Sequence, residues 1–253
     1  MKRWSWTALV AAGCLVGCGI GGGLPGGEGA AVTNPDGTVT LPDIPTGDGQ
    51  QGDPSTPETF SSLWPLTRGS SWTYRITDPF KGVSEKRVEI LGEETIPETT
   101  MTGIAVLSVQ PSKEEMSWQV ERNGTVLRLR EEDRKQGTLE QVKTWSPATI
   151  KSLSKEQPQG WSYTSDIREL TRIPADNSTE DKSKSYIWSV TAVNQTVTTP
   201  AGTFTNALRV ERKRGDKNKP EDDRVYWLVP GIGKVKEDGE RLEELVAYDV
   251  KKP

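Results

Sequence analysis

Residues 115–131 read EMSWQVERNGTVLRLRE, and this stretch decides the fold class of the chain. Two runs in which apolar and polar residues alternate lie on either side of Asn123 and Gly124. Alternation with a period of two is typical of a β-strand that buries one face. Asn and Gly both tolerate a positive φ, so an Asn-Gly pair between such runs predicts a two-residue hairpin turn. The stretch therefore predicts two antiparallel strands joined by a tight turn.

The same pattern recurs along most of the chain after residue 60. The further runs are SWTYRI (71–76), KRVEIL (86–91), GIAVLSV (103–109), SYIWSVTAV (185–193), ALRVER (207–212), RVYWLV (224–229) and GKVKE (233–237). Repeated short strands between turn residues are typical of all-β domains. We expect one antiparallel all-β domain of about 10–12 strands, arranged as a curved sheet, a half-barrel or a sandwich.

Helical patterns are few. The stretch SPATIKSLSKE at 146–156 has Ser146 as an N-cap candidate and Pro147 in the first helical turn, which predicts a short helix. The stretch RLEELVAY at 241–248 follows the turn residues Asp238 and Gly239 and suits either a helix or a closing strand. We therefore expect one or two short helices beside the strands.

The first residues predict export rather than a membrane span. Lys2 and Arg3 precede an apolar stretch at 4–17, which is shorter than the roughly 20 residues that a membrane-spanning helix needs. The stretch ends in Leu15, Val16, Gly17 and Cys18, and this ending resembles the bacterial lipobox. The resemblance implies cleavage after Gly17 and attachment of lipid to the Cys18 sulfur. Cys14 leaves with the signal, so no intramolecular disulfide is expected.

Composition divides the chain into three parts. Residues 1–17 are the expected signal peptide, residues 18–59 are a Gly- and Pro-rich stretch expected to be a flexible tether, and residues 60–253 hold the domain. The residue after Cys18 is Gly19 and not Asp. In the sorting rule of enteric bacteria that this arrangement resembles, Gly19 directs the protein to the outer membrane.

Composition also excludes several classes of function. The formal net charge is −4, whereas a nucleic-acid-binding domain presents an excess of basic residues. The chain has no His, which removes Ser-His and Cys-His catalysis and the commonest transition-metal ligand. The acidic clusters lie beside basic residues or in predicted turns, so carboxylate-based catalysis is the least favoured function. We expect no enzyme activity, no cofactor, no metal and no nucleic-acid partner.

Three longer motifs carry a family resemblance. They are WPLTRGSSWTY at 64–74, TTPAGTFTNALRVE at 198–211 and YWLVPGIGKVKEDG at 226–239. Their order and spacing resemble a broad group of bacterial envelope proteins of unassigned function, which is loosely similar to the LolA-like superfamily of lipoprotein carriers. That likeness implies a curved antiparallel sheet that forms an open half-barrel. The glycines and prolines of the motifs also suit turns and close backbone contacts, so a structural role is expected for them.

Two functions follow from these expectations. The first is binding of an apolar ligand such as a lipid, with the mid-strand aromatic residues Tyr74, Trp118, Trp188 and Trp227 as its lining. These rings could equally fill an ordinary core, because large aromatic side chains dominate core packing. The second function is a module that binds an envelope protein or a glycan. In both cases the partners are the membrane, through acylated Cys18, and a ligand or protein of the envelope.

Overall fold

The computed structural model describes residues 32–33, 39–40, 61–216 and 222–253. The expected signal peptide, the lipobox with Cys18 and most of the expected tether lie outside these ranges. Within the expected tether, β1 (Val32–Thr33) and β2 (Val39–Thr40) form a small antiparallel pair. The described residues contain no helix with the length and hydropathy that a membrane span requires.

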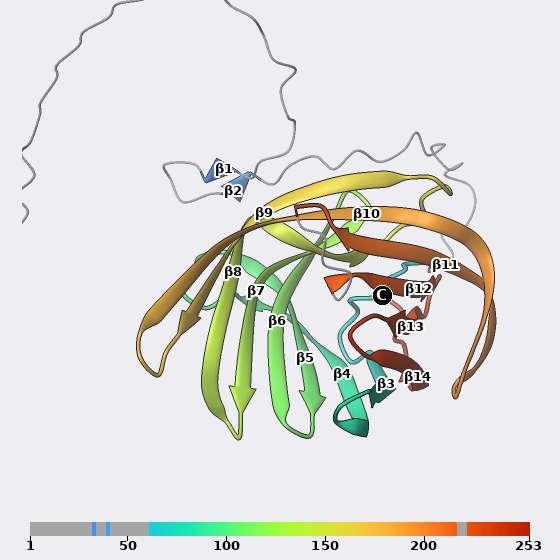
Figure 1. Cartoon of the computed structure of the whole chain (residues 1–253), viewed down its shortest axis with the longest axis horizontal. Helices are drawn as coiled ribbons and strands as arrows, with labels where there is room; N and C mark the ends of the chain where they lie inside the picture. Colours follow the sequence, from blue (N-terminus) through green and yellow to red (C-terminus); the bar gives the residue numbers. More distant parts are fainter. Residues whose placement is uncertain (1–31, 34–38, 41–60, 217–221) are drawn as a thin grey trace, which may run out of the picture.

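The domain is a closed barrel in which each strand pairs antiparallel with its neighbours (Figure 1). Its twelve strands are β3 (Ser71–Asp78), β4 (Gly82–Thr95), β5 (Thr102–Gln110), β6 (Lys113–Arg122), β7 (Thr125–Lys135), β8 (Thr138–Leu153), β9 (Ser162–Ile173), β10 (Ser178–Thr199), β11 (Gly202–Arg214), β12 (Arg224–Val229), β13 (Gly233–Asp238) and β14 (Leu242–Asp249). This confirms the all-β antiparallel class and the expected number of strands.

Closure of the sheet corrects the expected architecture. β14 pairs with β3, with Leu245 opposite Tyr74, and this pairing joins the two ends of the meander. The expected open half-barrel and the sandwich are therefore wrong. Alternation along a run reveals a strand and its buried face, but it carries no information on whether the first and last strands of a meander meet. A closed barrel leaves no unpaired sheet edge, which removes the usual route to edge-to-edge association.

The expected helix at 146–156 is also wrong, because β8 runs through most of it. Ala148 and Ile150 both point into the core and Thr149 between them is less buried, which is the period-two pattern of a strand. Residues 241–248 form most of β14 rather than a helix. No α-helix occurs in the described part of the chain.

Two turns predicted from the sequence are confirmed. Asn123 and Gly124 adopt φ values of 48° and 77° between β6 and β7, with Arg122 opposite Thr125. At the end of β10 the chain reverses before Gly202, which has a φ of 135°.

Residues 61–70 enter the barrel before β3 begins, and we call them the plug segment. Leu63 is fully buried among side chains that point inward from several strands, including Leu127, Leu208 and Leu228. The Leu63 backbone N–H donates to the Ser154 carbonyl at 2.8 Å. One end of the barrel interior is therefore filled by the chain that leads into β3.

Contacts with the third sequence motif hold the plug segment and the start of β3 in place. The Gly231 backbone N–H donates to the Ser62 carbonyl at 3.0 Å, and the Trp72 indole N–H donates to the Ile232 carbonyl at 2.7 Å. Gly233 has a φ of 99°, and a Cβ atom there would lie 3.3 Å from Cδ of Pro65. The glycines of PGIG thus allow the close backbone approach that the sequence predicted.

Candidate functional site

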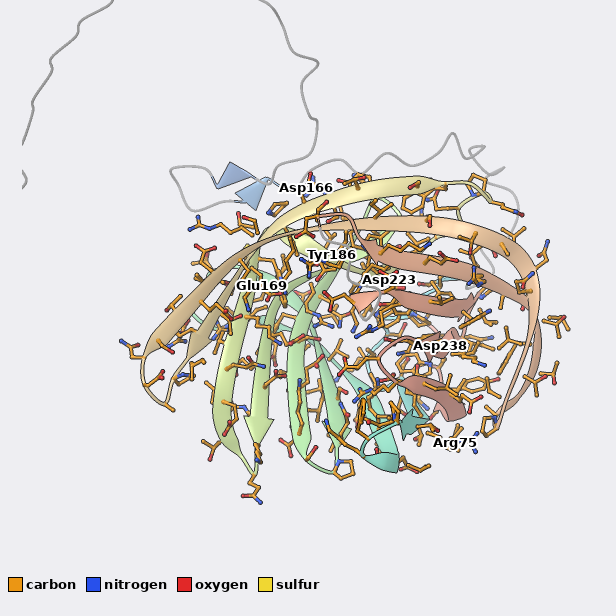
Figure 2. All side chains as sticks on the ribbon, in the orientation of Figure 1. Arg75, Asp166, Glu169, Tyr186, Asp223 and Asp238 are labelled. Carbon is orange, nitrogen blue, oxygen red and sulfur yellow. The ribbon has the colours of Figure 1, made fainter. Side chains whose placement is uncertain are left out.

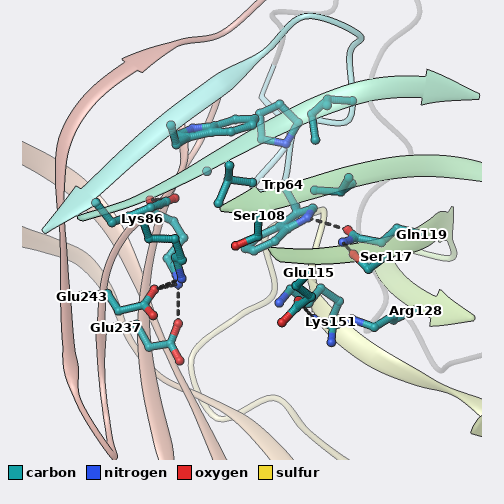
Figure 3. A pocket seen from close by; sticks show the side chains of 18 of the residues that line it. Trp64, Lys86, Ser108, Glu115, Ser117, Gln119, Arg128, Lys151, Glu237 and Glu243 are labelled. Carbon is teal, nitrogen blue, oxygen red and sulfur yellow. Dashed lines mark hydrogen bonds and ion pairs between the residues drawn. The ribbon is translucent and has the colours of Figure 1, made fainter. Parts of the chain in front are cut away.

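Two adjoining cavities occupy the barrel interior beyond the apolar packing around Leu63. The first has a volume of about 180 Å³ and the second about 290 Å³. Trp64, Arg128, Lys151, Lys234 and Glu237 line both. The indole N–H of Trp64 donates to Gln119 Oε1 at 3.0 Å, which holds the ring in place (Figure 3). Because Trp64 lines both cavities, the plug segment supplies part of the wall of each.

The lining of the two cavities is charged, with an excess of cations. One side of the first cavity is apolar, formed by Trp72, Val88, Ile90 and Val106. The charged side chains of the two cavities together are eight cations and five carboxylates: Lys86, Arg128, Lys143, Lys151, Arg212, Arg224, Lys234 and Arg241, with Glu115, Glu131, Glu169, Glu237 and Glu243. The barrel thus concentrates positive charge in its interior, although the chain as a whole has a formal charge of −4.

Most of these cations are paired. At the β13–β14 side, Lys234 contacts Glu243 at 2.8 Å and also pairs with Glu237, and Lys86 pairs with Glu243 as well. Arg241 contacts the same Glu243 carboxylate at 2.8 Å. The Tyr74 ring lies 4.9 Å from Lys234 Nζ, measured to the ring centroid. Burial is the largest influence on the pKa of Glu243 and raises it, but the surrounding ammonium groups outweigh burial and hold the pKa well below its ordinary value.

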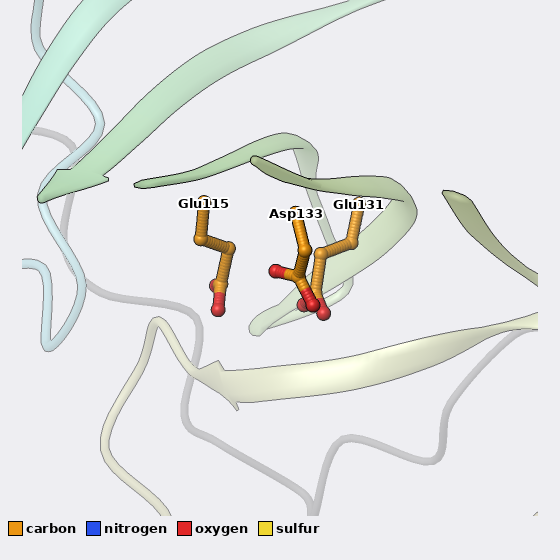
Figure 4. A group of neighbouring side chains, drawn as sticks. All are labelled: Glu115, Glu131 and Asp133. Carbon is orange, nitrogen blue, oxygen red and sulfur yellow. The ribbon is translucent and has the colours of Figure 1, made fainter. Parts of the chain in front are cut away.

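A second cluster places three carboxylates within 4.8 Å of one another, from Glu115, Glu131 and Asp133 (Figure 4). Carboxylates at this spacing are ligands that a hard cation prefers. Here protein cations already contact them: Lys143 lies 2.9 Å from Glu131 and Lys113 lies 2.6 Å from Asp133. Arg128 pairs with Glu131 and lies 3.6 Å from Glu115. Three cations thus balance three carboxylates, and the cluster is an internal ion-pair network.

Two cations of the lining, Lys151 and Arg212, differ from the paired ones because no carboxylate within the described residues lies within 4.0 Å of them. Lys151 makes no hydrogen bond or ion pair there, and its ammonium lies 5.6 Å from the centroid of the Trp64 ring. The Arg212 guanidinium stacks on Tyr186 at 4.8 Å and on Trp188 at 6.0 Å, and its only hydrogen bond among those residues is to the Asp222 carbonyl at 3.3 Å. Buried Nε atoms of Arg128 and Arg212 have no acceptor there. Unsatisfied buried donors of this kind are rare in native proteins and call for an explanation.

The environment of Lys151 makes its charge depend on pH near neutrality. Burial, followed by the positive charge of Arg128, lowers the pKa of Lys151 to about 7, although Glu115 opposes the shift. An acceptor anion beside Lys151 would stabilise its charged form and raise this pKa again.

The four aromatic residues expected to line a ligand site do not share one cavity. Tyr74 lines the first cavity, where its hydroxyl donates to the Lys234 carbonyl at 2.9 Å. Trp188 points inward but is packed in the core against Tyr226, with ring centroids 5.7 Å apart. Trp118 packs with Ile96 and Ala105, and Trp227 lies beside Arg209 and Lys236; neither tryptophan lines either of the two cavities.

Some of the residues that line the cavities could have been identified from the sequence. Trp64 belongs to the first motif, and Lys234 and Glu237 belong to the third, but the sequence predicted only a structural role for these motifs. Tyr186 and Glu169, which both line the second cavity, lie on strands β10 and β9 (Figure 2). Strand parity places Tyr186, Trp188 and Val190 on one face, so the inward position of Tyr186 could have been inferred once the buried face of β10 was known.

No protein-family model matches the chain, and no curated protein matches it. Among solved structures, the chain is similar to a Bacteroides fragilis protein described as exported and as having a YmcC-like fold, with 12% identity and a TM-score of 0.43. The likeness covers 75% of this chain and 99% of that one. A Parabacteroides distasonis protein described as a lipoprotein is 13% identical, with a TM-score of 0.39, over 76% of this chain and 100% of that one. Likeness of this degree assigns no function.

Proposed function

We propose that this chain is a non-catalytic lipoprotein of the cell envelope whose barrel binds a small anionic ligand in the two interior cavities. We propose an anionic ligand in place of the lipid expected from the sequence, because charged side chains, rather than strand aromatics, dominate the lining of the two cavities. The observation that carries the proposal is the pair of cations, Lys151 and Arg212, that face a cavity without a carboxylate partner among the described residues.

Burial of these two cations carries an energetic cost. Removing a charged group from water is unfavourable unless another group compensates its charge. Elsewhere in the interior, carboxylates compensate the cations, as Glu243 does for Lys234. For Lys151 and Arg212, aromatic rings give partial compensation, since a cation over a ring gains about 0.5–2 kcal/mol. An anionic ligand in the cavity would supply the remaining compensation.

Binding is tested by isothermal titration calorimetry with a panel of small carboxylates and phosphates on the Cys18→Ala chain, which lacks the acylation site. We expect Lys151→Met and Arg212→Gln each to weaken the binding of the tightest anion about tenfold or more, since hydrogen bonds to charged groups contribute about 1.5–3 kcal/mol. Arg168→Gln is the matched control, because Arg168 is exposed and pairs with Asp181 outside the cavities. Equal loss in all three variants would show a non-specific charge effect, and failure of every anion to bind the parent chain would exclude the proposal.

The membrane anchor is tested separately. We expect the wild-type chain, expressed in a Gram-negative bacterium, to fractionate with membranes and to carry acyl mass on the peptide that begins at Cys18. The Cys18→Ala chain should lose both properties, because only a thiol can accept the lipid at that position. Membrane association of Cys18→Ala together with an unmodified wild-type peptide would contradict the lipoprotein assignment.

A further inference from the structure

Resting on the proposed function, we infer that the ligand is an acidic saccharide: a hydroxylated ring that carries a carboxylate or phosphate group. The inference comes from the composition of the second cavity, which contains acceptors and aromatic rings as well as cations.

The acceptors argue against a bare inorganic anion. Glu131, Glu169 and Glu237 line the same 290 Å³ cavity as Lys151 and Arg212. A small anion placed there would meet like charges as well as opposite ones, and like charges in a low-dielectric interior oppose its binding. Each ionised carboxylate can accept several hydrogen bonds, more than its protein partners use. A ligand with several hydroxyl donors and one anionic group can satisfy the carboxylates and the cations together.

The aromatic side chains of the second cavity also suit an acidic saccharide. Trp64, Trp145, Tyr186 and Tyr226 all line the second cavity. Two of these rings hold the unmatched cations, because Lys151 lies over Trp64 and Arg212 lies over Tyr186. A ring fixes a cation without using its hydrogen-bond donors, so the N–H groups remain available to the anionic group of a ligand. The Tyr186 and Tyr226 side chains also bring hydroxyl groups that can donate or accept.

The size of the site favours one or two rings over an acyl chain. A cavity of about 150 Å³ holds a benzene molecule, so the second cavity can hold a single sugar ring with its substituents. The adjoining 180 Å³ cavity, with its apolar wall of Trp72, Val88 and Ile90, can hold a second ring or an apolar substituent. A long acyl chain would have to lie among the charged side chains of the second cavity, which is unfavourable.

The experiment compares matched probes on the Cys18→Ala chain by calorimetry at about pH 6.5, below the pKa of about 7 at which Lys151 loses its charge, and at low salt. The acidic saccharides are glucuronate, galacturonate and glucose 6-phosphate. The matched fragments are glucose, acetate and inorganic phosphate, and the neutral alcohol 1-octanol represents the apolar class. We expect at least one acidic saccharide to bind at least tenfold more tightly than both of its fragments. Glu169→Gln should weaken this binding without weakening the binding of acetate or phosphate, because it removes an acceptor for ligand hydroxyls together with a negative charge that opposes small anions.

The outcomes separate this inference from the function on which it rests. If acetate or phosphate binds as tightly as every acidic saccharide, the ligand class is wrong but the anion site stands. If only 1-octanol binds, or if no probe binds, the anion site and the saccharide inference fail together. If Glu169→Gln reduces the affinity for all anions equally, Glu169 affects the cavity as a whole, and its assigned role in hydroxyl recognition is wrong. A thermal melt of each variant identifies any that fail to fold, and the comparison of acidic saccharides with their fragments on the Cys18→Ala chain tests the inference without such a variant.

Discussion

Lys151 is the residue on which the charge of the interior depends most directly. Its pKa of about 7 lies below the ordinary lysine value, so between pH 7 and about pH 10 the unfolded chain binds more protons at this position than the folded chain does. The contribution of Lys151 to the free energy of unfolding of the wild-type protein therefore rises across that range. The cost of burying the charged amine is fully present below pH 7 and is lost as pH rises.

Replacement of Lys151 by Met should expose this dependence. We expect Lys151→Met to stabilise the ligand-free protein by roughly 3 kcal/mol at pH 6 and by less than about 1 kcal/mol at pH 10. The lowering of the Lys151 pKa from 10.5 to about 7 costs about 5 kcal/mol of stability at low pH, and loss of the contact with the Trp64 ring offsets part of the gain. Urea denaturation at both pH values measures the difference. Lys182→Met is the control, since Lys182 is exposed and pairs with Glu180. A gain that is the same at both pH values would show that Lys151 is not desolvated.

Substitution of Gly233 by Ala tests the contact between the plug segment and the barrel wall. An alanine there must adopt a φ of 99° and place its Cβ 3.3 Å from Pro65, so both backbone strain and crowding oppose it. Gly82 has a φ of 80°, and the space that a Cβ would occupy there has no other atom within 4 Å, which makes Gly82→Ala the matched control for backbone strain alone. We expect Gly233→Ala to lower the free energy of unfolding by about 1–2 kcal/mol more than Gly82→Ala does. Equal losses in thermal or urea denaturation would show that Pro65 moves aside without cost.

At the scale of elements, the sequence predicted individual strands and turns well and relations between elements poorly. The Asn123-Gly124 turn was predictable because the chemistry that allows positive φ resides in those two residues. The strand through Ala148 and Ile150 is preceded by Ser146 and Pro147, which suit the start of a helix, whereas the pairing that makes β8 a strand comes from β7 and β9. Bulges shift the parity of several strands, as between Trp118 and Gln119. Which tryptophan faces the interior could therefore not be read from alternation alone.

The plug segment is the element whose role the sequence did not reveal, and Leu63 is its anchor. Leu63 is fully buried among inward-pointing side chains of five strands, so Leu63→Ala leaves a cavity that the rigid barrel cannot close. We expect a loss of about 2–5 kcal/mol in the free energy of unfolding, measured by urea denaturation. Phe80→Ala should change it by less than about 0.5 kcal/mol, because Phe80 is 94% exposed. A small effect at Leu63 would mean that residues 61–70 leave the barrel readily.

At the scale of the whole molecule, closure of the barrel determines what the interior can bind. Lys86, Lys151, Arg212 and Lys234 come from four strands, and each looks in the sequence like a charged residue on a solvated face. Only the pairing of β14 with β3 turns those faces toward one another, and that pairing depends on residues about 170 positions apart, such as Leu245 and Tyr74. The sequence could thus supply the β class and the aromatic content, while the charged interior follows from long-range pairing that no local pattern encodes.

The charged groups around Lys151 make ligand binding depend on pH, and among these groups the dependence can be assigned to one residue. The charged groups that act on the pKa of Lys151 are, in decreasing order, Arg128 from β7, Glu115 from β6, and Lys234 and Glu237 from β13. Burial is the largest influence on the pKa of Glu115 and raises it, but the neighbouring cations outweigh burial and hold that pKa below its ordinary value, so Glu115 stays ionised throughout the neutral range. Arginine stays protonated at these pH values. Between about pH 6 and pH 8.5, Lys151 is therefore the group among these whose charge changes.

Affinity for an anion should consequently fall as pH rises through about 7, where Lys151 loses its proton. We expect glucuronate to bind several-fold more tightly at about pH 6 than at about pH 8.5, and to take up a fraction of a proton near pH 7.5 because its charge raises the pKa of Lys151. Calorimetry in two buffers of different ionisation enthalpy measures that uptake. Lys151→Arg keeps the positive charge at every pH in this range, so its affinity should be flat where that of the wild type falls. A pH profile that persists unchanged in Lys151→Arg would place the titrating group elsewhere in the barrel and would remove Lys151 from the anion site.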